Sequence, residues 1–410
     1  MTSDRTFVIV GAGLAGARAA ETLRSEGFDG RVVLLGSEAQ RPYNRPPLSK
    51  GYLRGEAKPD EVWVHEEGFY SANDIELRLG RTAAGLDTAT RTLALDDGDE
   101  LRYDRLLLAT GAEPRRLDVP GADLAGVHYL RTIADADVLA ERLGQGGRLV
   151  VIGAGWIGIE IAASARQAGM DVTVIAPAKL PLARILGDEI GTIYRDLHVE
   201  HGVTFRLGES VTALEGSGRV ERVRTGAGDA IECDLVVVGV GVTPRTQLAE
   251  AAGIAVDNGV LVDEHLQSGV AGIFAAGDIA NAEHPFYRER VRVEHWANAL
   301  NQGPVAAHGM LGKPATFDKL PFFYSDQYDT GMEYSGYTRT WDKVVFRGDP
   351  AAREFIAFWL QDGRVVAGMN MNIWDVNEHL QDLIRSRAVI PEGRLTDPDV
   401  PLDQLAATAG

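Results

Sequence analysis

The stretch VVIGAGWIGIE, residues 150–160, repeats in altered form the stretch FVIVGAGLAGA at residues 7–17. In both copies an apolar run leads into the pattern G-x-G-x-x-G, and a segment with helical spacing follows. A second apolar run comes next, RVVLLG after the first copy and DVTVI after the second. Strand, glycine turn, helix and strand in this order are typical of a dinucleotide-binding unit. The sequence therefore predicts two such units in one chain.

The glycines of each copy have separate physical tasks. Gly11 permits a tight turn, Gly13 lets the backbone approach a pyrophosphate, and Gly16 lets the helix pack closely on the strand. The N-terminus of the helix then offers free N–H groups and a partial positive charge to the phosphates. The matching positions of the second copy are Gly153, Gly155 and Gly158, with Ile157 inside the turn.

Three further apolar runs end in small residues, at Thr110–Gly111, at Gly241 and at Gly277–Asp278. Small residues at the end of a strand allow a ligand or another backbone to come near. Taken singly, the first two are better explained as simple strand exits. Glu38 stands about 20 residues beyond the first glycine turn, where a carboxylate can accept hydrogen bonds from ribose hydroxyls.

Length, charge and cysteine content restrict the class of protein. A chain of 410 residues suggests two or three domains. The net charge of −18 argues against nucleic acid or an anionic membrane as the main partner. The one cysteine, Cys233, cannot form a disulfide within the chain or a thiolate metal cluster, and no metal site is predicted. The N-terminus shows no secretory leader, and no apolar run approaches the roughly 20 residues of a membrane span, so we expect a cytoplasmic protein.

The sequence changes character from about Leu320 onwards. EFIAFWLQ and RVVAGMNM, separated by Asp362-Gly363, predict a hairpin with a two-residue turn. The segment DVNEHLQDLIRSR then places Val376, Leu380, Leu383 and Ile384 on one helical face. These patterns predict a separate small α+β domain.

Over nearly its whole length the sequence resembles the FAD-dependent NAD(P)H:ferredoxin reductases of bacterial oxygenase systems. The resemblance rests on both glycine turns and on six further stretches, in the order in which the family has them: RPYNRPPLSK, YDRLLLATGAEPR, GVGVTPRTQLAEAAGI, IFAAGDIA, RVEHWANALNQG and FFYSDQYD. It implies a glutathione-reductase-like fold of the α/β class, with two Rossmann-like dinucleotide-binding domains and a C-terminal α+β domain. The implied boundaries are 1–113 with 244–319 for FAD, 114–243 for NAD(P)H, and 320–410 for the C-terminal domain.

The resemblance also implies which residues hold the two nucleotides. For FAD these are Gly11, Gly13, Ala15, Gly16, Glu38, Arg45, Lys50, Ala83, Thr110, Gly111, Arg131, Gly277, Asp278 and Trp296. For NAD(P)H they are Gly153, Gly155, Ile157, Gly158, Glu160 and Gly241. Lys50 and Glu160 are the implied catalytic pair, with Lys50 beside the flavin ring and Glu160 near the nicotinamide. Reduced flavin is anionic, so a nearby ammonium stabilises it, and that ammonium needs a counter-charge.

One position departs from the family pattern. NADH-using relatives commonly end the second strand of the second copy with an acidic residue, whereas this chain has Ala176 there. No carboxylate then accepts the ribose 2′-hydroxyl, and Lys179 and Arg184 are near enough to meet a 2′-phosphate. NADH is the expected coenzyme, with NADPH as a possible one.

The implied partner is a [2Fe–2S] ferredoxin, and the protein is expected to be a monomer or a homodimer. Rubredoxin is an alternative acceptor, and an apoptosis-inducing-factor-like flavoprotein that responds to NADH and acts through partner binding is an alternative class. A disulfide reductase would need a redox cysteine beside the flavin, and residues 41–50 contain none. Arg288, Arg290 and Arg292 alternate with other residues, which predicts a strand with its arginines on one side. With Arg385 and Arg387, some of them would form a positive surface for an acidic ferredoxin; a solvated strand face or an internal ion pair explains the same pattern equally well.

Overall fold

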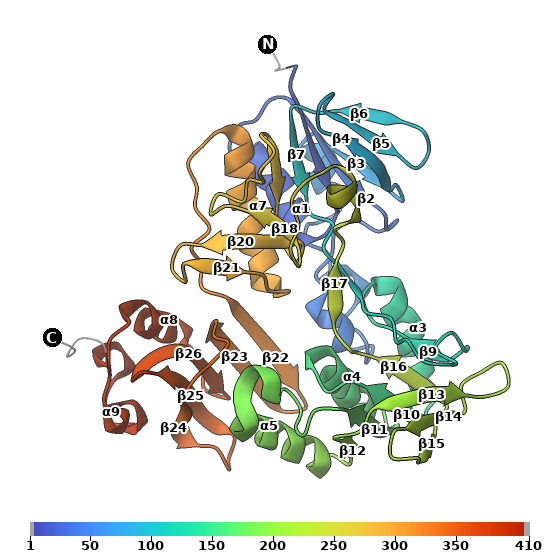
Figure 1. Ribbon diagram of the computed structural model, residues 1–410, viewed down its shortest axis with the longest axis vertical. Coiled ribbons are helices and arrows are strands. Elements are labelled where there is room, and N and C mark those ends of the chain that lie inside the picture. Colours follow the sequence, from blue (N-terminus) through green and yellow to red (C-terminus); the bar gives the residue numbers. More distant parts are fainter. Residues whose placement is uncertain (1–3, 406–410) are drawn as a thin grey trace. The chain divides into compact units, whose positions relative to one another are not determined.

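The computed structural model of the protein describes residues 4–405. Within these residues the chain forms two compact units (Figure 1). The first contains the described residues up to Asn44 together with Pro59–Glu113 and Val242–Pro321. The second contains Arg45–Lys58, Pro114–Gly241 and the described residues from Phe322 onwards. The short segment that carries Lys50 is thus separated from its neighbours in sequence and belongs to the second unit.

A five-stranded parallel sheet forms the centre of the first unit. Its strand order is β19-β7-β1-β2-β3, with the bounds Ile273–Ala275, Arg105–Leu108, Thr6–Val10, Arg31–Gly36 and Ile75–Leu79. Val8 in the central strand pairs with Val33 on one side and with Leu106 on the other. These residues are fully buried, which explains why the strands read as continuous apolar runs rather than as alternating ones.

Two helices of the first unit, α1 (Leu14–Ser25) and α7 (Trp296–Leu311), pack against each other. A side-chain carbon at Gly303 would lie 2.5 Å from the carbonyl oxygen of Ala15, so the two helix backbones approach unusually closely. The other elements of this unit are α2 (Phe69–Ala72), β4 (Ala83–Asp87), β5 (Thr92–Leu95), β6 (Glu100–Arg102), α6 (Gln247–Ala251), β18 (Val260–Val262), β20 (Ala280–His284) and β21 (Glu289–Val291). The short strands β8 (Ala112–Pro114) and β17 (Val242–Pro244) form a two-stranded ribbon.

The second unit repeats the parallel arrangement. Its sheet has the order β12-β11-β10-β16-β9, with the bounds Thr204–Leu207, Asp171–Ala176, Arg148–Ile152, Leu235–Val238 and Val127–His128. Its helices are α3 (Ile133–Gly144), α4 (Trp156–Gln167) and α5 (Ala183–Glu200), and a three-stranded sheet comprises β13 (Val211–Glu215), β14 (Arg222–Thr225) and β15 (Ala230–Glu232). Both predicted strand–turn–helix–strand units are therefore confirmed.

An antiparallel sheet completes the second unit. Its order is β22-β23-β26-β25-β24, with the bounds Phe322–Gln327, Thr330–Gly336, Arg364–Met371, Glu354–Gln361 and Lys343–Asp349. The predicted hairpin joins β25 to β26, and both turn residues, Asp362 and Gly363, have positive φ angles, as a type I′ turn requires. Helix α8 (Asn377–Ser386) buries Leu380, Leu383 and Ile384, and α9 (Glu392–Thr396) follows it.

The two sheets of the second unit share one apolar core. Trp359 of β25 is fully buried, and its indole N–H donates a hydrogen bond to the carbonyl oxygen of Leu186 in α5 at 3.1 Å. Phe323 of β22 packs edge-on against Trp156 at the start of α4, with ring centroids 4.9 Å apart. The N-terminal end of β22 is thereby fixed against the helix that follows the second glycine turn.

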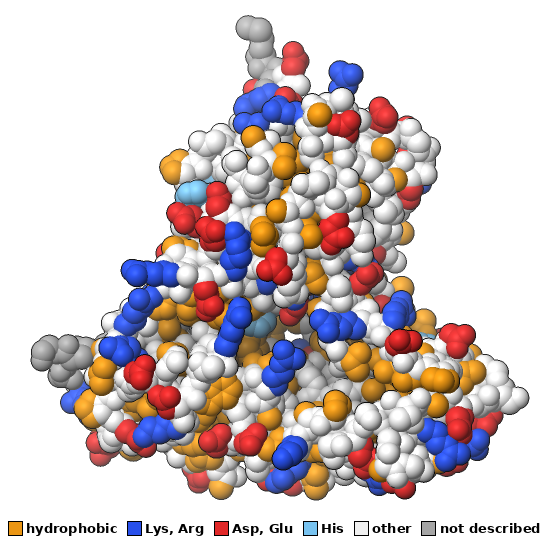
Figure 2. Space-filling view, in the orientation of Figure 1, with side chains coloured by type: hydrophobic (Ala, Val, Ile, Leu, Met, Phe, Trp, Pro, Cys, Tyr) orange, Lys and Arg blue, Asp and Glu red, His pale blue; other side chains and the backbone are white. Residues whose placement is uncertain are grey.

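The surface carries both signs of charge. On the face drawn in Figure 2, acidic and basic side chains are interspersed with hydrophobic and uncharged ones over each unit. Among residues 4–405, no helix is both long enough and apolar enough to span a bilayer.

Candidate functional site

The first glycine turn connects β1 to α1. Gly11 has a φ angle of +122°, and a side-chain carbon there would lie 2.0 Å from the carbonyl oxygen of Ala109. A side-chain carbon at Gly16 would lie 2.1 Å from the carbonyl oxygen of Gly11. Gly13 differs from both because nothing lies within 4 Å of the corresponding position, and no side chain caps the N-terminus of α1. The turn is therefore closed towards the sheet and open in front of the helix.

The second glycine turn, between β10 and α4, has the same geometry. Gly153 has a φ angle of +110°, and a side-chain carbon there would lie 2.3 Å from the carbonyl oxygen of Gly239. At Gly158 the distance to the Gly153 carbonyl oxygen would be 2.1 Å, and at Gly155 nothing lies within 4 Å. Each turn leaves open the place where a pyrophosphate would approach backbone N–H groups, so both fit a dinucleotide.

The strand ends predicted to face the nucleotides lie beside these turns within their own units. In the first unit, Thr110 donates a hydrogen bond to the carbonyl oxygen of Arg245 at 2.9 Å. The backbone N–H of Gly277 donates to the side-chain oxygen of Gln302 at 2.8 Å, and a side-chain carbon at Gly277 would lie 3.2 Å from the Cβ atom of Ala15 in α1. Gly111, Gly277 and, in the second unit, Gly241 all have positive φ angles, which explains the glycine at each.

The remaining predicted FAD residues of the first unit lie near its sheet. Glu38 follows β2 and accepts a hydrogen bond from the Tyr43 hydroxyl. Ala83 begins β4 and packs against the apolar core. Trp296 begins α7, and its indole N–H donates to the side-chain oxygen of Asn44 at 2.8 Å. The carbonyl oxygen of Asp278 accepts a hydrogen bond from Arg292 at 3.1 Å.

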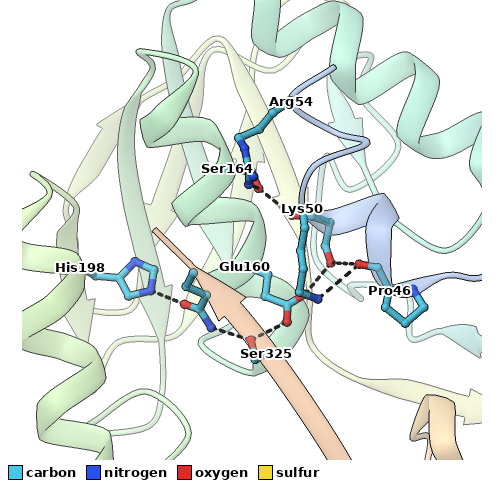
Figure 3. Close-up of polar contacts among 9 residues, drawn as sticks. Pro46, Lys50, Arg54, Glu160, Ser164, His198 and Ser325 are labelled. Atoms are coloured by element: carbon cyan, nitrogen blue, oxygen red, sulfur yellow. Dashed lines mark hydrogen bonds and ion pairs between the residues drawn. The ribbon is translucent and has the colours of Figure 1, made fainter. Parts of the chain in front are cut away.

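The predicted catalytic pair lies within the second unit (Figure 3). The ammonium nitrogen of Lys50 is 2.9 Å from the Oε2 atom of Glu160, and the side chains are 13 % and 4 % exposed. Lys50 follows the 3₁₀ turn Pro46–Ser49, and Glu160 lies in the second turn of α4. The ammonium also donates to the carbonyl oxygen of Pro46 at 3.3 Å. Burying an unpaired charge is costly, so each of these two side chains needs the other to remain ionised in this position.

Two more predicted residues meet in the second unit. The guanidinium of Arg45 donates a hydrogen bond to the carbonyl oxygen of Arg131. The backbone N–H of Arg131 donates to Asp135, and the Thr132 side chain and Asp135 form a capping box at the start of α3. Arg45 and Lys50 therefore both lie in the short segment Arg45–Lys58 that this unit takes from the N-terminal part of the chain.

The polar residues that surround Glu160 were not predicted from the sequence. The Ser49 hydroxyl donates to its Oε2 atom at 2.5 Å, and the Ser325 hydroxyl donates to its Oε1 atom at 2.6 Å. Burial raises the pKa of the neighbouring Asp326, with Lys50 opposing the shift and Glu160 adding to it. The available signal was alternation in β22, where Phe323, Ser325 and Gln327 share one face.

The predicted arginine surface is partly wrong. Strand β21 covers only Glu289–Val291, and Arg288 precedes it in a left-handed turn. Arg290 pairs with Glu283 at 2.7 Å and donates to the carbonyl oxygens of Val262 and Asn281. Arg292 is only 9 % exposed and pairs with Glu294. Two of the three arginines therefore bind acidic side chains or backbone carbonyl oxygens of their own unit. The strand is also too short to place all three arginines on one face.

Comparison with known proteins identifies the class. Residues 5–303 match the family described as pyridine nucleotide-disulphide oxidoreductase, and residues 322–406 match the reductase C-terminal domain. The ferredoxin–NAD(+) reductase component of the anthranilate 1,2-dioxygenase system of Burkholderia cepacia is 40 % identical over 97 % of each chain. The chain belongs to this oxidoreductase family and, within it, to the ferredoxin reductases that carry the C-terminal reductase domain.

The names of two further relatives mention a small redox protein, putidaredoxin in one and rubredoxin in the other. The crystal structure of a covalent putidaredoxin reductase–putidaredoxin complex matches with a TM-score of 0.95 and 37 % identity over 99 % of each chain. A rubredoxin–NAD(+) reductase of Pseudomonas putida is 35 % identical over 90 % of this chain and 96 % of its own. The protein is thus an oxidoreductase that uses FAD and NAD(P)H, as the sequence predicted.

Proposed function

We propose that this protein transfers electrons from NAD(P)H through FAD to a [2Fe–2S] ferredoxin that serves an oxygenase. The observation that carries the assignment is the buried pair of Lys50 and Glu160, because Glu160 stands on the helix that begins at the second glycine turn. The names of the relatives support a ferredoxin as acceptor, and the complex with putidaredoxin shows a reductase of this fold held by such a partner.

The residues of the chain have separate tasks in this proposal. Gly11, Gly13 and Gly16 with the N-terminus of α1 would bind the FAD pyrophosphate, and Gly153, Gly155 and Gly158 with α4 would bind that of NAD(P)H. When bound, NAD(P)H supplies a hydride, and FAD accepts it and returns electrons singly. Lys50 would stabilise negative charge at the flavin ring from a site largely closed to water, and Glu160 would hold Lys50 there.

Cysteine chemistry is no part of this proposal, although the family name mentions disulphides. Cys233 is the one cysteine of the chain, and its side chain is 1 % exposed. Burial raises the pKa of its thiol to about 12, so it is protonated at neutral pH and inert as a nucleophile. A disulfide reductase of this family would need two reactive cysteines, and the chain cannot supply them.

The choice of acceptor is tested by anaerobic kinetics with the purified flavoprotein. The enzyme reduced by NADH is mixed with a [2Fe–2S] ferredoxin and, separately, with rubredoxin, and the return of oxidised flavin is followed. Fast reoxidation by the ferredoxin supports the proposal, while fast reoxidation by rubredoxin alone supports the rubredoxin reductase. Slow turnover with both, together with a long-lived charge-transfer band, supports a flavoprotein that acts by binding partners.

The role of Glu160 is tested by Glu160→Gln. The amide cannot hold the Lys50 ammonium in its position as the carboxylate does, and we expect flavin reduction by NAD(P)H to slow by about 100-fold, the order measured for loss of one preorganised electrostatic contact. The absorption of bound flavin should stay unchanged, because the first unit is intact. Flavin reduction at the wild-type rate would remove Glu160 from the mechanism.

A further inference from the structure

A buried chain of hydrogen bonds starts at the Glu160 carboxylate and leads away from Lys50, through Ser325 and Gln327 to His198 (Figure 3). Ser325 and Gln327 lie on one face of β22, and His198 comes from α5. The Gln327 amide nitrogen donates to the Ser325 hydroxyl oxygen at 3.1 Å, and the His198 Nε2 atom is 2.7 Å from the Gln327 amide oxygen. The Tyr328 hydroxyl lies 3.2 Å from the other ring nitrogen of His198.

The charge of Glu160 fixes the direction of every bond in this chain. A carboxylate can only accept, so the Ser325 hydroxyl donates to it, and its oxygen then accepts from the Gln327 amide N–H. The amide oxygen of Gln327 in turn requires a proton on His198 Nε2. His198 is therefore the neutral Nε2–H tautomer, and its Nδ1 atom accepts from Tyr328.

This hydrogen-bond chain can hold the Glu160 carboxylate in one orientation, but it cannot relay a proton. The amide of Gln327 donates and accepts but does not exchange protons readily, so it interrupts any relay between Ser325 and His198. Burial lowers the pKa of His198 to about 4, which keeps the ring neutral and the bond direction constant at physiological pH. Aligned donors in a buried chain polarise one another and strengthen the final bond to the carboxylate.

Resting on the function proposed above, we infer that Gln327 and His198 are positioning residues for the catalytic pair. Through Ser325 they hold the Glu160 carboxylate in the orientation in which its other oxygen accepts the Lys50 ammonium. Ser49 holds that same oxygen from the opposite segment, and the Ser164 hydroxyl fixes Ser49 by donating to its carbonyl oxygen at 2.7 Å. Hydrogen bonds from both sides therefore hold the Lys50–Glu160 pair within the second unit.

Other titratable groups also act on Glu160 and must stay constant in a test. They are Lys50 from the 45–58 segment, Asp326 and Tyr324 from β22, and Tyr194 from α5. Arg54 lies near by, donating to Ser164 at 3.3 Å and pairing with Glu56. Substitutions at Gln327 and His198 leave all of these side chains in place.

The test replaces Gln327 by Met in the full holoenzyme, which removes both hydrogen bonds at nearly constant volume. We expect flavin reduction by NAD(P)H to slow by about tenfold, since the Glu160 carboxylate is no longer held in the orientation that faces the Lys50 ammonium. A second readout is the flavin midpoint potential, which should become more positive as Lys50 loses part of its counter-charge. Gln361→Met is the matched control, because Gln361 makes an exposed contact to Thr340 outside the chain.

A pair of substitutions at His198 gives an independent route. His198→Gln keeps an N–H group near the position of Nε2 and should retain the wild-type rate of flavin reduction and the wild-type potential, whereas His198→Met should behave like Gln327→Met. Wild-type behaviour of both Met variants, with Glu160→Gln altered, overturns the inference and leaves the proposed function standing. Failure of the reduced wild-type enzyme to pass electrons to a [2Fe–2S] ferredoxin would instead contradict the proposed function.

Discussion

The two glycine turns have nearly the same geometry but different surroundings. In both, the first glycine has a positive φ angle and its N–H donates to the neighbouring strand at 2.8 Å, to Leu35 in one unit and to Ile175 in the other. The residue before the third glycine is Ala15 in the first turn, 5 % exposed beneath α7, and Ile157 in the second, 45 % exposed. This difference fits a first nucleotide that stays bound and a second that exchanges in every turnover.

The largest expected effect comes from adding one methyl group to each turn. Gly13→Ala and Gly155→Ala both place it in open space before a helix N-terminus, so folding is retained. Loss of charge-assisted backbone hydrogen bonds worth about 3 kcal/mol weakens nucleotide binding by roughly 100-fold. Gly13→Ala should be purified with little flavin, and Gly155→Ala should keep its flavin but show a raised KM for NAD(P)H.

Gly144→Ala is the matched control, because its added methyl group also meets nothing within 4 Å and lies at the end of α3. It should behave as the wild type in both assays. If Gly155→Ala were to lose flavin as Gly13→Ala does, the assignment of separate nucleotides to the two turns would fail.

Each unit contains one buried histidine whose pKa is lowered to about 4 by burial, His295 in the first and His198 in the second. The ordinary pKa of histidine is 6.5, so between about pH 4 and pH 6.5 the unfolded chain binds more protons than the folded chain. Each neutral histidine therefore contributes up to about 3 kcal/mol to the free energy of unfolding. This contribution is fully present above about pH 6.5 and is lost as the pH falls to about 4.

This pH dependence is measured by thermal unfolding across that range. His198→Gln and His295→Gln should each flatten the decrease in Tm, and His265→Gln, at a half-exposed side chain, should not. Parallel decreases in all three variants would show that other groups cause the acid lability.

A third contrast concerns the strands that follow the turns. Glu38 follows β2, whereas β11 ends at the uncharged Ala176. Ala176→Glu adds a carboxylate for the ribose 2′-hydroxyl and repels a 2′-phosphate, so the ratio of kcat/KM for NADH over NADPH should rise about tenfold. Lys179→Ala should raise the ratio less, by removing a charge near the same place. An unchanged ratio in both variants would place the discrimination elsewhere.

The smallest expected effect is at the surface. Arg288 is exposed, whereas Arg290 and Arg292 are held by internal contacts. Arg288→Glu should slow reduction of an acidic ferredoxin by about threefold at low salt and leave flavin reduction by NAD(P)H unchanged. Arg91→Glu, at another exposed left-handed turn of the same unit, is the control. Equal slowing by both variants would indicate a general charge effect.

Local patterns in the sequence predicted most of the fold. The glycine turns, the continuous apolar strands and the Asp362-Gly363 hairpin each depend on residues close together in the chain, so their signals are visible directly. The surroundings of Glu160 could not be predicted in this way, because Ser49, His198 and Ser325 come from three distant segments. The arginine row was misjudged because alternation alone does not fix the length of a strand.

The single buried thiol has a practical consequence. Flavin enzymes work in the presence of oxygen, and an exposed thiolate would be open to oxidation, whereas Cys233 is inaccessible and protonated. A cysteine introduced on the surface would be the one thiol available to a maleimide dye or to a cross-linker. Site-specific labelling of this reductase therefore needs no cysteine-free background, and distances to a labelled partner can be measured on the otherwise native chain.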